Sequence, residues 1–139
     1  MAIDPRRRTS TGEVKSTFRI GWLDDFVLEV IFDGNVDGVL IASLDKAIRE
    51  KLLGRTKPWA MLFVGEKIEK ITADVRGPAI EMLSFIKAQK PAVTVGATPN
   101  LAARMFGGTL GFAVGFKLEV VDSRAEGMKA IEAARRKAT

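Results

Sequence analysis

The stretch that decides the fold runs from Lys57 to Gln89 and reads KPWAMLFVGEKIEKITADVRGPAIEMLSFIKAQ. Its apolar beginning, Trp59–Val64, predicts a buried strand, and the polar residues after it predict a long loop that ends at Thr72–Asp74. A helix is expected from about Gly77, because Pro78 suits a first helical turn. The apolar residues of that helix recur three or four positions apart, as one buried face requires: Ala79, Met82, Leu83 and Ile86.

The chain has 139 residues, enough for one domain with a substantial core, and 47% of them are hydrophobic, as in ordinary globular proteins. No apolar run approaches the roughly 20 residues that a membrane span needs, and the start shows no signal-peptide pattern. We therefore expect a cytoplasmic protein with no membrane partner. We also expect a disordered basic tail over residues 1–15 and a single domain over residues 16–139.

The net charge of +5 is concentrated at the two ends of the sequence. Residues 1–15 contribute +2 and residues 124–139 contribute +3, whereas residues 16–123 carry thirteen basic and thirteen acidic side chains. A nucleic-acid footprint needs basic groups gathered on one face. The separation of the charges therefore argues against a nucleic-acid partner.

Three residue types that carry much of enzyme chemistry are missing, since the chain contains no histidine, tyrosine or cysteine. Nucleophilic triads that use histidine are excluded, and so are metal sites built from imidazole or thiolate ligands. Only lysine or carboxylate chemistry stays open, and no cluster of such groups stands out. We expect a non-enzymatic protein without a cofactor.

Two apolar runs near the start, Thr17–Leu23 and Phe26–Phe32, flank the dipeptide Asp24-Asp25 and predict a β-hairpin. Aspartate is favoured at turns for conformational reasons, so this pair is expected at an exposed tip rather than in a catalytic or metal site.

The next residues, Asp33–Gly38, match the first half of a calcium loop, D-x-N-x-D-G. The twelfth position of such a loop is a bidentate glutamate, and here it is Leu44. We favour a turn between strand and helix, in which Asp33 and Asn35 adopt unusual backbone angles and Asp37 caps the helix.

The rest of the chain alternates helical patterns with short strands. The expected elements are a helix over Leu40–Leu52, a strand over Ala92–Val95, a helix from Pro99 to about Phe106 capped by Thr98, an apolar connection through glycine-rich residues 107–116, a strand over Lys117–Val121 and a helix after Asp122-Ser123. The last helix is expected to turn four residues inward: Ala125, Met128, Ile131 and Ala134. The order ββαβαβαβα predicts an α/β fold with a mixed, mostly parallel sheet and flanking helices.

This order, with the residues at its junctions, resembles the sulfate-transporter and anti-sigma-factor-antagonist (STAS) domain over roughly residues 17–134. The resemblance rests on the turn Phe32–Asn35, the junction before the central helix, and the ending VVDSRAEGM over Val120–Met128. It implies a bacterial signalling module that binds a protein partner, such as a kinase-like protein.

Domains of this family often carry a phosphorylatable serine in a D-S-S/T-G motif at the start of the central helix. The matching residues here are Asp74-Val75-Arg76-Gly77, in which both hydroxyl positions are replaced. The usual switch is therefore expected to be absent, and Thr72 is the only hydroxyl nearby. Asp74 and Arg76 are expected to pair with each other, or else Arg76 anchors a carboxylate of a partner.

If the strands run parallel, the turn at Asp33–Asp37 and the junction at Gly96–Asn100 lie at the same end of the sheet as the residues around Thr72. Together with the resemblance, this arrangement predicts a protein-binding surface. Its expected residues are Thr72, Asp74, Val75, Arg76, Gly77, Asp33, Asn35, Thr98 and Asn100. An anti-sigma-factor-antagonist-like regulator is the leading hypothesis.

A second feature is the apolar segment of residues 105–116. Its five large residues fill the core or form an apolar interface: Met105, Phe106, Leu110, Phe112 and Phe116. The alternative functions both use this segment, either as the roof of a pocket for a small apolar or anionic ligand or as the contact of a homo-oligomer.

Overall fold

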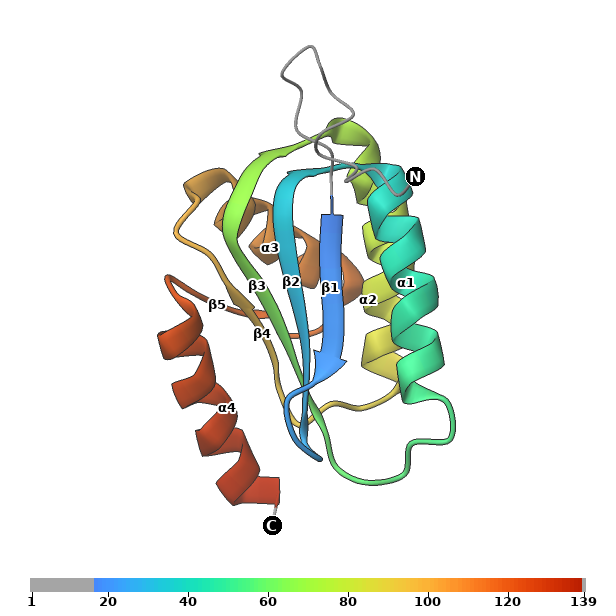
Figure 1. Ribbon diagram of the computed structural model, residues 1–139, viewed down its shortest axis with the longest axis vertical. Helices are drawn as coiled ribbons and strands as arrows, with labels where there is room; N and C mark the ends of the chain where they lie inside the picture. The colour runs from blue at the N-terminus through green and yellow to red at the C-terminus, as the bar shows by residue number, and fades with distance from the viewer. Residues whose placement is uncertain (1–16, 139) are drawn as a thin grey trace, which may run out of the picture.

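The computed structural model describes residues 17–138, and the expected basic tail over residues 1–15 lies outside them. The elements follow the predicted order ββαβαβαβα (Figure 1). They are β1 (Thr17–Trp22), β2 (Val27–Val36), α1 (Gly38–Leu52), β3 (Ala60–Ile71), a short 3-10 helix (Ala73–Val75), α2 (Arg76–Ala88), β4 (Thr94–Ala97), α3 (Leu101–Val114), β5 (Glu119–Val121) and α4 (Arg124–Ala138).

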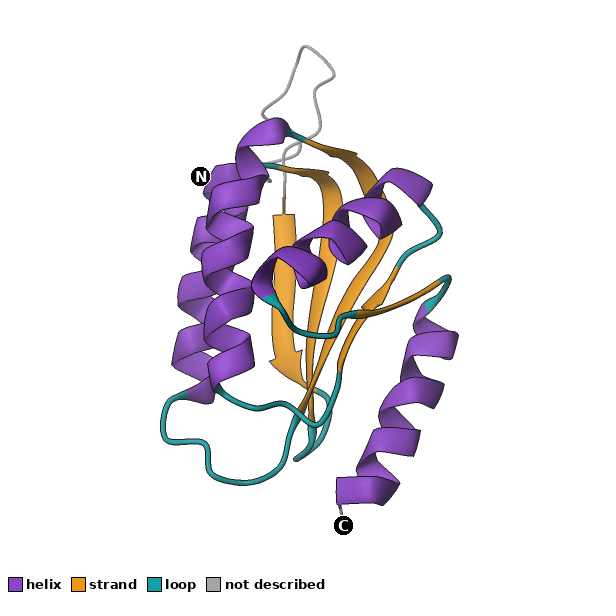
Figure 2. Ribbon diagram, turned by 180° about the vertical axis from the view of Figure 1, so that it is seen from behind, coloured by secondary structure: helices purple, strands orange, loops and turns teal. Residues whose placement is uncertain are grey.

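The five strands form one mixed sheet in the order β1-β2-β3-β4-β5. β1 is antiparallel to β2, and every other neighbouring pair is parallel. Figure 2 shows α3 lying across the strands on the face that α1 and α2 also cover, while α4 lies against the opposite face (Figure 1). The predicted α/β architecture is therefore confirmed. None of the helices within residues 17–138 is long and apolar enough to cross a membrane.

The predicted hairpin is present, and Asp24 shapes its turn. The carboxylate of Asp24 accepts hydrogen bonds from the backbone N–H groups of Phe26 at 2.8 Å and Val27 at 2.9 Å. The N–H of Leu23 donates to the carbonyl oxygen of Val27 at 2.9 Å and closes the turn. This aspartate has the structural role that the sequence indicated.

The turn predicted after Phe32 and the loop predicted after Val64 are both wrong, because β2 and β3 continue through these residues side by side. β2 runs to Val36 and β3 runs to Ile71, and these two residues are partners at the end of the ladder. Two register shifts interrupt the pairing, one between Ile31 and Asp33 and one after Gly34. Such irregularities break the strict alternation of apolar and polar residues. The extension was therefore hidden from a period-2 analysis.

The helix predicted from Pro99 to Phe106 is also wrong in extent. α3 continues through the glycine-rich residues to Val114 and ends at Gly115, whose φ of 75° suits the left-handed position after a helix. A Cβ on Gly111 would lie 3.1 Å from the carbonyl oxygen of Phe116. Close packing of the helix against the segment before β5 thus explains a glycine that propensity alone would assign to a loop.

The shorter strands and the last helix need smaller corrections. β4 begins two residues later than predicted, and β5 is limited to Glu119–Val121. In α4, Ile131 is buried as predicted, but Ala125 is exposed and Gly127 is buried instead. A Cβ on Gly127 would lie 3.0 Å from a methyl group of Leu62, so the helix approaches the sheet closely there.

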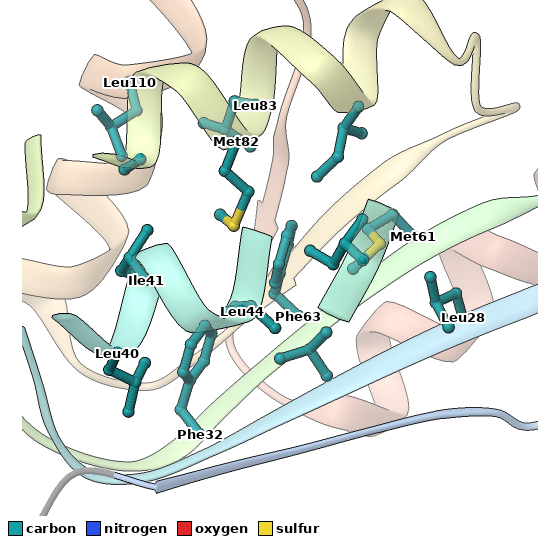
Figure 3. Packing of buried hydrophobic residues seen from close by; sticks show 14 of the residues in the cluster. Leu28, Phe32, Leu40, Ile41, Leu44, Met61, Phe63, Met82, Leu83 and Leu110 are labelled. Carbon is teal, nitrogen blue, oxygen red and sulfur yellow. The ribbon is translucent and has the colours of Figure 1, made fainter. Parts of the chain in front are cut away.

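Two hydrophobic clusters hold the layers together. The larger one joins β2 and β3 to α1, α2 and α3, and Figure 3 shows its side chains converging between the sheet and these helices. The four residues predicted for the buried face of α2 all belong to it: Ala79, Met82, Leu83 and Ile86. The smaller cluster packs Ile131 of α4 on Leu62 and Val95 of the sheet.

Candidate functional site

The predicted surface residues follow the carboxyl ends of parallel strands, which meet at one edge of the sheet. The strands end at different heights along this edge. β4 ends where Ala97 pairs with Val64, whereas β3 continues seven residues further to Ile71. The partner strand β2 covers the same stretch in five residues, from Ile31 to Val36, so at about 3.3 Å per residue the two strand ends lie roughly 17 Å apart. The predicted residues therefore lie in two groups.

The first group is the turn from Thr72 to Gly77. The N–H of Thr72 donates to the carbonyl oxygen of Val36 at 3.0 Å, and its hydroxyl donates to the carboxylate of Asp74. The turn also lies close to the start of α1, since a Cβ on Gly38 would be 2.8 Å from the carbonyl oxygen of Asp74. Gly38 is thus a residue that the sequence analysis missed, and only its place beside a helix cap hinted at it.

Arg76 is the first residue of α2, and its side chain is exposed. The predicted ion pair with Asp74 is wrong, since these two described side chains form no such pair, and the Asp74 carboxylate accepts a hydrogen bond from Thr72. Within residues 17–138, no ion pair or hydrogen bond engages the guanidinium of Arg76. Gly77 beside it is also exposed, so Arg76 is an accessible cation at the start of α2.

Val75 lies in the same turn but faces the interior, with 1% of its surface exposed. It belongs to the main core and lines a cavity there. Its side chain therefore does not reach the outer surface of the turn, although its neighbours Asp74 and Arg76 do.

Asp33 and Asn35 lie within β2 and not in a loop. They are half-buried, and they stand opposite Lys67 and Lys70 of β3. Neither has a backbone angle in the left-handed region, which among these residues is found at Gly34 with a φ of 87°. The glycine absorbs the backbone irregularity that the sequence analysis assigned to its two neighbours. The predicted helix cap by Asp37 is confirmed, since its carboxylate accepts from the N–H of Leu40 at 2.8 Å.

The second group is Thr98 and Asn100, which follow β4. The cap of α3 was predicted at Thr98 and is found at Asn100, whose side chain accepts from the N–H of Ala103 at 3.0 Å. Thr98 is buried, and its hydroxyl donates to the carbonyl oxygen of Gly65 at 2.8 Å. The same hydroxyl accepts from the N–H of Asn100 at 3.1 Å. Both polar side chains therefore serve the local fold.

The five residues of the predicted apolar segment are divided between the core and the surface. Leu110 is buried, and Phe106 and Phe116 pack against the main core. Met105 is 65% exposed and Phe112 is 91% exposed. Together with Leu101 they follow a spacing of four and seven residues, so they share one outer side of α3.

An ion pair between a buried carboxylate and a half-exposed guanidinium anchors α4 on the opposite face of the sheet, and the sequence analysis missed it. The guanidinium of Arg124 lies 2.6 Å from the carboxylate of Glu29, which is buried in β2. The N–H of Arg124 donates to the carboxylate of Glu66 at 3.2 Å. A charged residue within the apolar run VLEVIF was the available signal, since a buried charge requires a partner.

Metal chemistry finds no support at this edge. Among the described residues no three acidic side chains converge on a common point, and the Asp33–Asp37 stretch is mostly strand. The calcium-loop alternative therefore loses the geometry on which it depended.

No family model matches the sequence, and no curated protein matches it. Solved structures do match the fold. One is an uncharacterized protein of the DUF3478 family with a SpoIIAA-like fold from Shewanella loihica PV-4, with a TM-score of 0.62, 10% identity and coverage of 83% of this chain and 94% of the other. Another is the anti-sigma factor antagonist SpoIIAA in its unphosphorylated form, with a TM-score of 0.61, 14% identity and coverage of 86% and 98%.

These two matches define the class of fold. The chain folds as a STAS-like domain, of the kind that an anti-sigma factor antagonist also adopts. At 10% and 14% identity the likeness concerns the fold, so the function has to be argued from the chain's own surface.

Proposed function

We propose that this chain is a non-enzymatic, cytoplasmic regulatory module that binds an acidic segment of another protein through the exposed turn Thr72–Gly77. The observation that carries the proposal is Arg76, an exposed cation at the start of α2 with no ion-pair partner among the described residues. The likeness to an anti-sigma factor antagonist supports a regulatory role for the same fold.

Stability does not explain Arg76 at this position. The start of a helix carries a partial positive charge, so a cation there is unfavourable by about 0.3–1 kcal/mol. Among the described residues no carboxylate forms an ion pair with Arg76. A guanidinium that destabilises its own helix is well placed to bind a carboxylate from outside, since it offers two parallel donors.

The proposed module is not switched by phosphorylation at the position where STAS domains often carry a serine. Val75 has no hydroxyl and is buried, and Arg76 carries a permanent positive charge. Binding is therefore expected to be constitutive with respect to that modification, and its strength should fall with salt because the contact is exposed.

Affinity capture with three baits tests the proposal. The wild type, Arg76→Glu and the control Lys51→Glu are used on the same lysate of the source organism. Lys51 is an exposed cation in the last turn of α1, at the other end of the sheet. We expect a partner that wild type and Lys51→Glu retain and Arg76→Glu loses by about tenfold or more, the equivalent of roughly 1.4 kcal/mol. Equal retention by all three baits would contradict the proposed surface.

A second candidate role is self-association through α3, and the exposure of Phe112 favours it. Leu101, Met105 and Phe112 form an apolar strip on the outer side of this helix. Large exposed apolar groups in one patch are typical of interaction sites. Light scattering of wild type and Phe112→Ser across a range of concentrations tests this role. A wild type that stays monomeric throughout would remove it.

A further inference from the structure

An apolar pocket of about 110 Å³ extends from the surface into the main core, beneath the proposed binding turn. Its walls come from β2, β3, β4, β5, α1, α2 and α3. Figure 3 shows six of its lining residues: Phe32, Ile41, Phe63, Met82, Leu83 and Leu110. The half-buried residues Ile68, Ile71 and Phe106 also line it, so the cavity reaches toward the surface between β3 and α3.

The chemistry of the walls selects a neutral, apolar occupant. No charged side chain lines the cavity, and Thr98 is its only polar one. The Thr98 hydroxyl already donates to Gly65 and accepts from Asn100. A water molecule needs two to four polar partners, and an ion would lose its hydration without compensation. The anionic ligand that the sequence left open has no counterpart here.

The cavity exists because small residues stand where larger ones would fill it. Ala79, Ala103 and Gly96 line it, and a Cβ on Gly96 would meet nothing closer than a methyl group of Leu118 at 4.0 Å. An engineered apolar cavity of about 150 Å³ in another protein stays dry and binds benzene or xenon. The pocket here has a volume of comparable order but opens to the surface, so it suits a small hydrocarbon group that enters from solvent.

α3 is the wall best suited to move. It contains Gly107, Gly108 and Gly111, and each glycine in a helix interior costs roughly 0.5–1 kcal/mol relative to alanine. Its outer side is exposed, so only its inner side is held by packing. Elements with low local stability are the ones that open most readily.

One wall of the cavity is the inner side of the proposed binding turn. Val75 and Ala79 line the cavity, while Asp74 and Arg76 extend from the same turn to the solvent. An occupant therefore touches the residues that hold the turn in place. A ligand that prefers one arrangement of the turn shifts the protein toward it.

We propose that this pocket binds a small, neutral, apolar molecule, that movement of α3 adjusts its width, and that its occupancy orders the turn Thr72–Gly77. Ligand binding stands independently of the proposed function, whereas its regulatory meaning rests on that function. Occupancy and partner affinity would then be coupled reciprocally.

Methyl NMR with benzene and xenon as probes tests the binding. We expect saturable shifts at Val75, Ala79 and Leu110, and none at Ile131 on the other face of the sheet. Ala103→Leu places a larger side chain in the cavity and should abolish the shifts. Ala102→Leu, the neighbouring exposed position on the same helix, should retain them. Gly96→Ala provides a second, milder filling if Ala103→Leu does not fold, and it should weaken binding at least twofold.

Three results would overturn the binding. They are the absence of saturable shifts up to the solubility limit of benzene, equal shifts in the filled variants, and shifts confined to Leu101 and Met105 on the outer side of α3. Amide hydrogen exchange tests the ordering without any partner. Benzene should slow exchange at residues 72–77 at least twofold, and unchanged exchange with a saturated cavity would overturn the coupling. Failure of affinity capture alone would contradict the proposed function and not the cavity.

Discussion

The amino edge of the sheet, where β2 and β3 begin, is tied together by side chains, whereas the carboxyl edge between α2 and α3 is open around a cavity. At the amino edge the guanidinium of Arg55 donates to the carbonyl oxygen of Pro58 at 2.9 Å and to that of Asp25, and it stacks on Trp22 at 4.4 Å. Lys57 lies 3.3 Å from the carboxylate of Asp25. Arg55, Lys57 and Asp25 thus find partners in one another or in nearby carbonyl groups.

At the carboxyl edge α3 is tied by the ion pair of Arg104 with Asp122, and the Thr98 hydroxyl donates to Gly65. The start of α2 has no such ion pair within residues 17–138. Arg76 has no partner within the described residues, and small side chains leave space beneath the turn. At the amino edge the side chains favour stability, whereas at the start of α2 the described residues leave a cation unpaired and a space unfilled. Departures from local stability that persist in a folded protein often mark functional sites.

The largest expected loss of stability comes from a substitution at the amino edge. Trp59 is buried there, and its indole N–H donates to the carbonyl oxygen of Gln89 at 3.0 Å, which joins β3 to the end of α2. Trp59→Ala should lower the free energy of unfolding by about 3–5 kcal/mol, measured by urea denaturation. The exposed Lys51→Ala at the same edge should stay within about 0.5 kcal/mol of wild type. A loss below about 1 kcal/mol in Trp59→Ala would break the comparison.

A smaller effect is expected for α4, whose first residue Arg124 anchors it at the carboxyl edge. Arg124→Ala leaves the buried carboxylate of Glu29 without its partner, and the free energy of unfolding should fall by about 1–3 kcal/mol. In the double variant Arg124→Ala, Glu29→Gln the charge is gone, so part of the loss should return. Additive losses would mean that the pair is not coupled. Recovery of stability in the double variant would show that the carboxyl edge is held by an ion pair at α4. The open part of this edge would then be limited to the side of α2 and α3.

The smallest effect at the amino edge is a dependence on pH through Asp24. Partial burial would raise the pKa of the Asp24 carboxyl, but hydrogen bonds from the N–H groups of Phe26 and Val27 and from Arg135 lower it overall. A lowered pKa in the folded state contributes stability that is present above the usual pKa and lost as pH falls through the folded value.

Asp24→Asn tests this sign in urea denaturation at several pH values. The variant should be less stable than wild type at pH 7 by under about 1 kcal/mol, because solvent screens the half-exposed carboxylate. The difference should shrink as the pH falls into the acidic range where the folded carboxyl is protonated. A difference that stays constant down to the lowest pH would contradict the role of the Asp24 charge.

The sequence predicted those elements that combine a clear period with a clear boundary. In α2 the four apolar positions and Pro78 sufficed, and in α1 the cap at Asp37 agreed with the pattern. The end of β3 was predicted wrongly because its apolar residues Ile68 and Ile71 are three positions apart. The irregular register with β2 permits this spacing, which a regular strand does not show. The length of α3 was predicted wrongly because Gly111 packs against the backbone of Phe116. Helix propensity describes single residues and takes no account of such tertiary contacts.

The candidate site was predictable only in part for the same reason. The identity of residues 74–77 follows from a local motif, so the turn could be located from the sequence. The inward direction of Val75, the missing pair of Arg76 and the cavity depend on contacts between β3, α2 and α3. These contacts join segments far apart in the chain, and no local pattern encodes them.

The central claim is that Arg76 serves binding at the expense of stability, and one variant measured in two ways tests it. Arg76→Ala removes a cation from the start of a helix, so its free energy of unfolding should equal or exceed that of wild type by a few tenths of a kcal/mol. Its affinity for the captured partner, measured by calorimetry, should fall about tenfold. Unchanged affinity, or a loss of stability larger than about 0.5 kcal/mol, would contradict the account.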